Sequence, residues 1–546
     1  MKIIQGKAAS KGLAIGKIYL YKKKQDAVKC QYLKQDEVDA ELKKLDDSLA
    51  KAKEQLKELY DKAVAQVGQK DAQVFEIHQM MLEDEDYLND IHSMIKDDKF
   101  VAEYAAFVTG EKFAKNFAEM DDEYMQGRAA DVRDVSSRLI NCLMGGEDAL
   151  IGMEDKFILV ADDLNPSETI KLDKSKLLAF VTLQGSVSSH TAILARNLGI
   201  PAIVQADEPF DDSIDGKLAI VDGYKGNFYI DPDEVTLAMM NKKKIDEDET
   251  KALLLTLKGK EDITLDGHKI EIMANMGSPS EIEMIIDSDA HGVGLFRSEF
   301  LYLETHTYPD EETQFNAYRK VLEALKGKKV VIRTMDIGAD KQVDYFNLDK
   351  EENPALGLRG IRLSFARSDV FKTQLRALFR ASAFGILAIM FPMITSPWEI
   401  DEAKNFIEEV KDELRKEKHV FDEDVEIGIM IETPAAAVTA DVLAKKVDFF
   451  SIGTNDLTQY TLAVDRQNQK IDRYVDTHHP AVLRLIANVV VAAHKEGAWV
   501  GICGELGSDL TLTKEFLRMG IDELSVSPAK VLEVRRQVRM TKVTKK

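Results

Sequence analysis

The pattern of apolar and polar residues changes its period twice along the chain. Within the first 22 residues, Leu13–Leu20 alternate in the manner of a β-strand. Apolar residues then recur in steps of three and four, which places one apolar stripe on a long helix. The stripe consists of Val38, Leu42, Leu45, Leu49, Ala52, Leu56 and Leu59. Further helical runs are predicted at 72–95, 101–118 and 123–144, followed by Gly145-Gly146. The pattern predicts an up-and-down domain of four helices.

Short strands return between residues 150 and 230. They are predicted at 157–160, 178–181, 202–204, 218–221 and 228–230. The strand near Ile15 is expected to join their sheet, which would make the helical domain an insertion into an α/β domain. A charged, mostly helical connector follows.

The rest of the chain alternates strand and helix eight times, which is typical of a (β/α)8 barrel. Its strands are predicted at 270–273, 292–295, 330–332, 388–391, 427–431, 449–452, 499–502 and 523–526. The predicted fold is therefore multidomain α/β, with a helical insertion in the first α/β domain and a TIM-type barrel after it. The predicted boundaries are 1–22 with 146–230, 23–145, 231–261 for the connector and 262–546 for the barrel.

The amino-acid composition and net charge exclude several classes of function. The 546 residues are 45% hydrophobic and 31% charged, as in an ordinary globular protein. The net charge of -22 argues against a nucleic acid partner and favours a basic protein partner. Three cysteines fit a reducing compartment, and no apolar run predicts a signal peptide or a membrane span. We therefore expect a cytoplasmic protein. The sequence also contains no P-loop motif for binding ATP.

The stretch 184–196 predicts a loop that opens a short helix, with His190 in the first turn. Ser188 or Ser189 can cap the free N–H groups. A helix N-terminus attracts anions, so an imidazole held there could carry a phosphoryl group. The alternative is that His190 only extends the cap.

Charged and polar residues recur at the carboxyl ends of the predicted barrel strands, where such barrels place their chemistry. These are Asn275, Arg297, Arg333, Glu432, Asn455, Asp456 and Cys503. The loop after the third strand adds Asp336, Asp340, Lys341, Arg359 and Arg362, and Arg466 follows the sixth strand. Several arginines indicate a phosphate-bearing anion. The carboxylates of Glu432 and Asp456 suit Mg²⁺. The alternative is a set of ordinary ion pairs at an exposed rim.

Other residues have two interpretations each. Cys503 could deliver a proton, or it could be a buried packing cysteine. In the helical domain His78 and His92 are predicted to be surface residues. Met80-Met81 fits either a core or an adaptable binding surface.

Several segments carry a family resemblance. Gly185–Arg196 resembles the phosphohistidine motif of enzymes that use phosphoenolpyruvate. Six further segments resemble the substrate-binding half of those enzymes. They are Gly294–Leu301, Val331–Gly338, Asn353–Arg359, Met430–Ala436, Ser451–Tyr460 and Gly501–Glu505. The ordered set resembles the enzyme I family of the bacterial phosphoenolpyruvate-dependent sugar phosphotransferase system, over nearly the whole chain.

The resemblance implies a reaction and roles for residues. His190 would take the phosphoryl group of phosphoenolpyruvate, and Cys503 would protonate the leaving enolate to give pyruvate. The implied substrate-binding residues are Arg297, Arg333, Asn455, Asp456, Arg466 and Arg359. Glu432 and Asp456 would hold Mg²⁺.

The resemblance also implies partners. The phosphocarrier protein HPr would dock on the helical domain and accept the phosphoryl group, as the first step of sugar uptake. We expect that dock near Met80-Met81 and the acidic residues Glu83, Asp84 and Glu85. In the family the barrel forms a homodimer.

Small departures from the family pattern occur at Ser186, Val187, Ser188, Ser298 and Ala339. Only Val187, where a basic residue is usual, changes chemical character, so an effect on rate or orientation is expected. Two rival hypotheses are a non-catalytic signalling scaffold and a dikinase-like fragment that needs a separate ATP-binding subunit. The complete set of expected catalytic residues argues against the first, and the helical insertion argues against the second.

Overall fold

The computed structural model divides into two compact units, residues 1–249 and 250–546, which are described separately. The described residues are all except 22–27, 68, 120–122, 146–154, 165–167, 169–171, 174, 186–190, 193–194, 197–198, 304, 306, 339–343, 350, 467 and 545–546.

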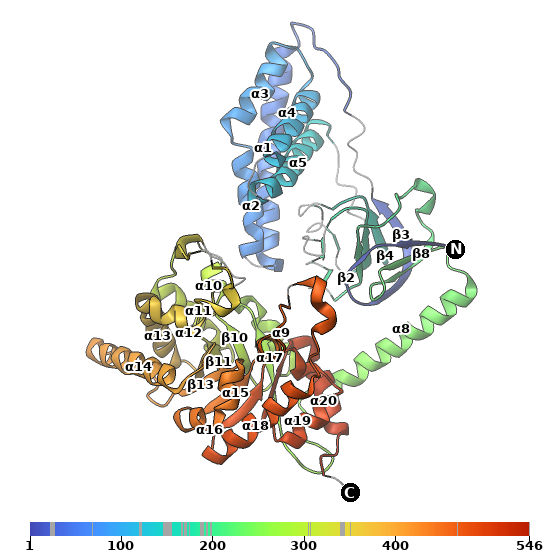
Figure 1. The fold of residues 1–546 in the computed structure, drawn as a ribbon. Helices are drawn as coiled ribbons and strands as arrows, with labels where there is room; N and C mark the ends of the chain where they lie inside the picture. The colour runs from blue at the N-terminus through green and yellow to red at the C-terminus, as the bar shows by residue number, and fades with distance from the viewer. Residues whose placement is uncertain are drawn as a thin grey trace. The chain divides into compact units, whose positions relative to one another are not determined.

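The first unit contains a group of helices whose apolar stripes meet in one core (Figure 1). The helices are α1 (Val38–Val67), α2 (Gln69–Met81), α3 (Glu85–Lys96), α4 (Ala102–Ala118) and α5 (Glu123–Leu143). Leu45, Ala52 and Leu56 of the predicted stripe are fully buried. The three-and-four spacing therefore identified the buried face of α1.

The prediction of one continuous helix over residues 72–95 was wrong. The chain turns at Leu82–Asp84 between α2 and α3. Asp84 has an extended backbone, and its carboxylate accepts a hydrogen bond of 2.9 Å from the Tyr87 N–H. A short acidic side chain at this position ends one helix and starts the next. It does so because its carboxylate accepts a hydrogen bond from an N–H group that has no partner within the helix.

The prediction that His78 lies on the surface was also wrong. Its side chain is fully buried, and its Nε2 lies 3.4 Å from an Asp131 carboxylate oxygen. His92 is partly exposed, and its Nδ1 lies 2.7 Å from the Leu88 carbonyl oxygen. Met80 is 69% exposed, whereas Met81 packs against the helical core. The two methionines therefore have different environments.

An eight-stranded mixed sheet forms the rest of the first unit, in the order β1-β8-β7-β3-β4-β5-β6-β2. The strands are β1 (Lys2–Gln5), β2 (Lys7–Ser10), β3 (Leu13–Tyr21), β4 (Phe157–Ala161), β5 (Leu177–Thr182), β6 (Ala202–Val204), β7 (Leu218–Asp222) and β8 (Asn227–Ile230). β3 pairs parallel with β4 and antiparallel with β7. The N-terminal strand thus joins this sheet, and the helices α1–α5 are inserted between two neighbouring strands. β1 and β2 were not predicted.

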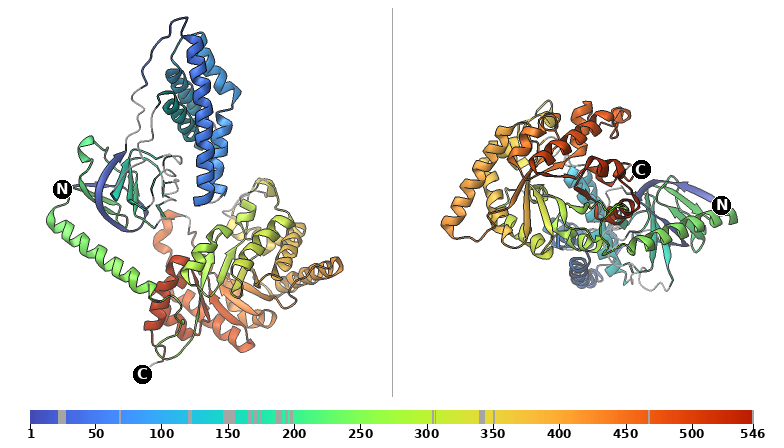
Figure 2. Two further views of the ribbon diagram at one scale, coloured as in Figure 1. Left: turned by 180° about the vertical axis from the view of Figure 1, so that it is seen from behind. Right: turned by 90° about the horizontal axis from the view of Figure 1, so that it is seen from below.

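Helix α8 (Glu234–Leu255) follows the sheet and is continuous in the views of Figure 2. It spans the boundary between the two units. None of the helices in the described part of the chain is both long and apolar enough to cross a membrane.

The second unit is a closed barrel of eight parallel strands. They are β9 (Glu271–Met276), β10 (Val293–Arg297), β11 (Lys329–Arg333), β12 (Ile386–Phe391), β13 (Glu426–Ile431), β14 (Phe449–Ile452), β15 (Trp499–Ile502) and β16 (Glu523–Val526). Each overlaps a predicted strand, so the barrel is confirmed. The described longer helices are α9 (Ile282–Ser288), α11 (Glu311–Ala324), α13 (Ser368–Ser382), α14 (Pro397–Glu417), α17 (Thr454–Leu462), α18 (Pro480–Glu496), α19 (Thr513–Met519) and α20 (Val531–Met540).

Shorter helical turns complete the barrel. They are α10 (Phe300–Leu303), α12 (Ile361–Ala366), α15 (Pro434–Val438), α16 (Ala440–Leu443) and the 3-10 turns η3 (Pro279–Glu281), η4 (Asp344–Phe346), η5 (Pro354–Leu356), η6 (Ala444–Lys446), η7 (Gln469–Tyr474), η8 (Glu505–Ser508) and η9 (Pro528–Lys530). One large core lies between strands and helices. A smaller core fills the barrel and consists of Leu295, Val331, Ala388, Met390, Met430, Phe449 and Cys503.

Candidate active site at the barrel mouth

The parallel strands bring their carboxyl ends to one face, and this determines which side chains meet. Arg297 and Arg333 are the last residues of β10 and β11 and are register partners. Glu432 and Cys503 each follow directly after a strand, β13 and β15. Asn455 and Asp456 lie in the first turn of α17. The sequence prediction of these positions therefore agrees with their place in the fold.

Arg333 is buried between two carboxylates. Its Nη2 lies 2.8 Å from Glu299 Oε1 and its Nη1 lies 3.2 Å from Asp336 Oδ2. Burial by itself lowers the pKa of this guanidinium, but Glu299 and Asp336 outweigh burial and raise the pKa above its usual value. The side chain is thus a fixed positive charge, and its Nε has no hydrogen-bond partner among the described residues.

Arg359 shares one of these carboxylates and bridges to α17. Its Nη2 donates to both oxygens of Asp336 at 3.1 and 3.2 Å. Its Nη1 donates to Asp456 Oδ1 at 3.4 Å and to the Tyr460 hydroxyl at 3.2 Å. One planar guanidinium therefore fixes the loop after β11 against the first turn of α17.

Glu432 lies close to this ion cluster and is 1% exposed. Its Oε1 accepts a hydrogen bond of 2.7 Å from the Met393 N–H, and its Oε2 has no described partner. Burial, followed by repulsion from Asp336 and Asp456, raises the pKa of Glu432 to about 8. An unpaired carboxylate oxygen among other carboxylates is a position that a proton or a cation would stabilise.

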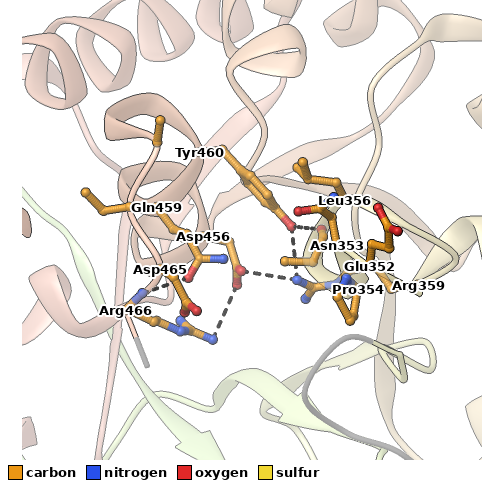
Figure 3. Close-up of a pocket in the computed structure, with 13 residues that line it drawn as sticks. Glu352, Asn353, Pro354, Leu356, Arg359, Asp456, Gln459, Tyr460, Asp465 and Arg466 are labelled. Carbon is orange, nitrogen blue, oxygen red and sulfur yellow. Dashed lines mark hydrogen bonds and ion pairs between the residues drawn. The ribbon is translucent and has the colours of Figure 1, made fainter. Parts of the chain in front are cut away.

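A pocket of about 540 Å³ opens beside the cluster (Figure 3). The side chains of Arg359, Asp456, Tyr460 and Arg466 converge there, and Arg466 Nη2 lies 3.8 Å from Asp456 Oδ2. Gln459 accepts a hydrogen bond from the Arg466 N–H at 3.2 Å. The half-exposed Arg466 is thus held at the edge of a cavity that also has buried charge.

A second pocket, of about 350 Å³, is lined by Arg297, Asn455, Cys503 and Asn275 among others. Arg297 is exposed and has no ion pair within the part of the chain that the structure describes. The Cys503 thiol is 2% exposed, and burial raises its pKa to about 11. The sulfur therefore stays protonated near neutral pH, as an acid must be before it donates.

The predicted residues thus fall into three groups. Arg297, Asn455 and Cys503 line the smaller pocket, and Arg359, Asp456 and Arg466 line the larger one. Arg333 and Glu432 are buried and line neither pocket. The alternative hypothesis was a set of ordinary ion pairs at an exposed rim. It does not describe Arg333 and Arg359, because each of these side chains is at most 6% exposed.

His190 lies outside the described residues, together with Ser186, Val187, Ser188 and Ser189, and so do Ala339, Asp340 and Lys341. The structure describes the residues on either side of the segment 186–190. The Gly185 carbonyl accepts a hydrogen bond from Gln205 at 2.9 Å, and the Thr191 hydroxyl donates to the Leu164 carbonyl at 3.4 Å.

Family models cover most of the chain. The model "PEP-utilising enzyme, PEP-binding domain" matches residues 251–543. The models "PEP-utilising enzyme, N-terminal" and "PEP-utilising enzyme, mobile domain" match residues 5–128 and 153–226. A phosphoenolpyruvate-protein phosphotransferase of Priestia megaterium is 42% identical over 98% of this chain and 94% of its own length. The chain belongs to the phosphoenolpyruvate-protein phosphotransferase family.

Two further comparisons concern this family. A phosphoenolpyruvate-protein phosphotransferase of Haemophilus influenzae is 43% identical over 98% of this chain and 94% of its own length. A solution structure of an enzyme I protein is 34% identical to this chain, with a TM-score of 0.40, and the match covers 45% of this chain and 99% of that chain.

The sequence pattern did not indicate a role for Glu299 or Tyr460, although both lie in segments that resemble the family. Glu299 is 3% exposed and accepts hydrogen bonds from Arg333 and from the Asp336 N–H at 3.1 Å. The available signal was a glutamate two residues after a strand-end arginine in a largely apolar segment. Such a carboxylate needs a partner, because a buried unpaired charge is costly.

Proposed function

We propose that this protein transfers the phosphoryl group of phosphoenolpyruvate to His190 and from there to a histidine of HPr, releasing pyruvate. The observation that carries the proposal is the buried cluster of arginines and carboxylates at the mouth of a barrel in a chain of this family. Guanidinium groups bind phosphate and carboxylate through paired hydrogen bonds. The substrate presents both groups.

Charge balance supports a cation as part of the site. Arg297, Arg333, Arg359 and Arg466 carry four positive charges, and four of the carboxyl groups around the site are enough to offset them if all four ionise. These are Glu299, Asp336, Glu432 and Asp456. No excess positive charge would then remain for an anionic substrate, so a further cation or a proton is required.

Mg²⁺ fits this requirement. It takes one or two carboxylates and completes its coordination with water and substrate oxygens. Glu432, with its unpartnered Oε2, and Asp456 would hold it. Among the described residues no group of three or more metal-ligating side chains occurs, so the chain itself offers only part of a coordination shell. When bound, the ion would draw negative charge from the phosphate oxygens.

The residues of the chain have separate tasks in this proposal. Arg297, Arg333 and Arg466, helped by Asn455 and Arg359, bind the phosphate and carboxylate and orient the phosphorus for in-line attack by His190. Neutralisation of charge by these fixed cations does most of the catalytic work. The buried thiol of Cys503 then donates its proton to carbon 3 of the enolate and forms pyruvate.

The proposal extends to the arrangement of the chain and its partners. Residues 1–22 with 146–230 form the phosphohistidine domain, 23–145 the HPr-binding domain, 231–261 the linker and 262–546 the substrate-binding and dimerisation domain. The exposed Met80 and the acidic turn at Glu83, Asp84 and Glu85 form part of the HPr dock. The protein acts in the cytoplasm as a homodimer, at the first step of sugar uptake.

The test is incubation with ³²P-labelled phosphoenolpyruvate and Mg²⁺. Wild type, His190→Ala and His419→Ala are compared, since His419 is an exposed histidine of the barrel and serves as a matched control. We expect acid-labile label on wild type and His419→Ala and none on His190→Ala. Removal of Mg²⁺ with EDTA should abolish labelling, and added HPr should remove the label from the protein.

Each of the other outcomes would contradict one specific part of the proposed function. Absence of label on wild type would overturn the enzymatic proposal and favour the scaffold. Label on His190→Ala would place the phosphoryl group elsewhere. Label that does not move to HPr would make the proposed acceptor wrong, and labelling in EDTA would make the role of Mg²⁺ wrong.

A further inference from the structure

The thiol of the proposed reaction lies where a strand pairing ends. Cys503 follows β15 directly, and the last register pair between β15 and β16 joins Ile502 to Leu524. The Cys503 carbonyl therefore lies just beyond that pairing. Asn275 of β9 reaches it with its side chain, because its Nδ2 donates a hydrogen bond of 3.3 Å to the Cys503 carbonyl oxygen. A side chain from another strand thus holds the backbone of the residue that carries the thiol.

The amide group of Asn275 is itself held in one orientation by Ser525 of β16. Its Oδ1 accepts a hydrogen bond of 2.7 Å from the Ser525 hydroxyl, and its Nδ2 also donates to the Ser525 carbonyl oxygen at 3.3 Å. Ser525 is fully buried. An amide has one acceptor oxygen and two N–H bonds, and each end is used here. The contacts with Ser525 therefore direct the amide N–H group toward Cys503.

On its other side, the chain after Cys503 is packed against the first turn of α17. A Cβ atom at Gly504 would overlap the Thr454 hydroxyl, so glycine allows this close approach. The Glu505 N–H donates to Asn455 Oδ1 at 3.2 Å, and Asn455 Nδ2 donates to Glu505 Oε1 at 3.4 Å. The segment that contains the thiol is therefore held from both sides.

These contacts determine where the thiol lies beside the smaller pocket. The Cys503 sulfur lies 3.7 Å from the Ile452 carbonyl oxygen, and the Cys503 N–H donates to the same oxygen at 3.2 Å. Asn275, Arg297 and Cys503 all line this pocket of about 350 Å³. The end of β14 thus contacts one side of Cys503, and Asn275 of β9 contacts its carbonyl.

The position of a proton donor decides the stereochemistry of the product. Carbon 3 of the enolate is trigonal and has two faces. A donor must lie within hydrogen-bond reach of the atom that it protonates, and a displacement of about 1 Å can slow a reaction by about 100-fold. A donor fixed on one side forms the new C–H bond on that face alone, whereas water reaches both faces of an enolate in solution.

We propose that Asn275 is a positioning residue for the protonation step. By holding the Cys503 carbonyl against Ser525, it keeps the thiol on one face of the enolate. This inference rests on the proposed role of Cys503 as proton donor. In that step the S–H bond of Cys503 breaks as the π electrons of the enolate form the C–H bond of pyruvate. The thiolate that remains then takes a proton from solvent water.

The test follows the stereochemistry of the methyl group of pyruvate. (Z)-[3-²H]phosphoenolpyruvate is converted in tritiated water with HPr as acceptor, and the pyruvate is reduced at once to lactate so that it cannot exchange. Wild type should give one configuration of the chiral methyl group in large excess. Asn275→Asp keeps the size of the side chain but has no N–H to donate, and Asn275→Ala removes the whole amide.

Both Asn275 variants should reduce the enantiomeric excess to about half or less, because the enolate is then protonated partly by water. The value of kcat should fall by about tenfold, whereas KM for phosphoenolpyruvate should change by less than about threefold. Asn316→Asp is the matched control, since Asn316 is an exposed asparagine of the same domain, and it should behave as wild type.

A merely structural role has a different result. If Asn275 only joins β9 to β16, its variants should lose stability or rate but keep the wild-type enantiomeric excess, and this outcome would overturn the proposal. Loss of the excess in Asn316→Asp would also overturn it, because the effect would then not depend on Asn275.

Ser525→Ala keeps the proposal testable if neither Asn275 variant folds. It removes the hydroxyl that orients the amide, so the enantiomeric excess should fall by a smaller amount, and an unchanged excess would contradict the proposal. Failure of the proposed function is distinguishable. It would appear as absence of phosphoryl label on wild type, or as a wild-type enantiomeric excess in Cys503→Ala.

Discussion

At the scale of single residues, the site depends on guanidinium groups that each contact two partners. Arg359 donates to Asp336 through one nitrogen and to Asp456 and Tyr460 through the other. A lysine has one ammonium group on a flexible stem and cannot bridge these groups in the same plane. The residue type therefore matters here beyond its charge.

Arg359→Lys should reduce kcat/KM for phosphoenolpyruvate by about 10- to 100-fold, because the loop after β11 loses its connection to α17. The measurement is steady-state pyruvate formation with HPr as acceptor. Arg362→Lys is the matched control, since Arg362 donates only to the carbonyls of Leu356 and Gly357 among the described residues. Equal losses in both variants would contradict the specific role of Arg359.

The buried acid of Glu523 predicts how stability depends on pH. Its folded pKa of about 8 lies above the ordinary value of 4.5, so the folded state binds the proton more tightly than the unfolded state. Stability from this group is therefore complete below about pH 4.5 and is lost as the pH rises through about 8. Relative to wild type, Glu523→Gln should gain a few kcal/mol between pH 5 and pH 9.

This comparison has a convenient probe. Both tryptophans, Trp398 and Trp499, lie in the barrel unit, so their fluorescence during urea unfolding reports on the barrel alone. Parallel pH profiles of wild type and variant would show that Glu523 does not titrate with a raised pKa.

At the scale of elements, local caps decide where helices begin and periodicity decides which face they bury. The apolar steps of α1 predicted its buried stripe. They could not locate the turn between α2 and α3, because apolar residues continue across it at Leu82 and Tyr87, both of which are buried. The residue that marks this turn in the sequence is Asp84, whose carboxylate accepts a hydrogen bond from the Tyr87 N–H.

Asp84→Ala should destabilise α3 by about 1 kcal/mol, because the first turn loses its cap. Hydrogen–deuterium exchange of the α3 peptides should accelerate, whereas exchange of barrel peptides should not change. Asp84→Asn keeps an oxygen acceptor and should show near-wild-type exchange. Faster exchange in the asparagine variant alone would contradict the cap.

At the scale of the whole molecule, one buried arginine connects the C-terminal helix to the start of the barrel domain. Arg535 of α20 is 1% exposed. Its guanidinium donates to Asp262 Oδ1 at 2.6 Å, to the Asp289 carbonyl at 2.8 Å and to the Leu257 carbonyl at 3.2 Å. Residues more than 240 positions apart are thereby fixed where the chain leaves α8.

Arg535→Met should lower the free energy of unfolding of the barrel by about 3 kcal/mol or more, because the buried carboxylate of Asp262 loses its arginine partner. Urea unfolding followed by tryptophan fluorescence measures this loss. The neighbouring Arg536→Met serves as the control and should change stability by less than about 0.5 kcal/mol. A loss of similar size in both variants would show that general charge removal, and not the Asp262 pair, is responsible.

The sequence alone determined the parts of this protein that depend on local pattern. Strand and helix periods predicted the barrel, the helical insertion and the sheet that includes the N-terminal strand. The position of polar residues directly after strands predicted the mouth residues, because parallel strands bring all their carboxyl ends to one face.

Only the tertiary structure decided which of these residues meet and in what environment. Periodicity does not show that Asp336 lies between Arg333 and Arg359, that Glu299 is a buried partner, or that His78 is enclosed by helices. These facts depend on contacts between strands and loops far apart in the chain. Burial of Glu432, Cys503 and Glu523 shifts their pKa values for the same reason, since the loss of water around a group is a property of the assembled barrel.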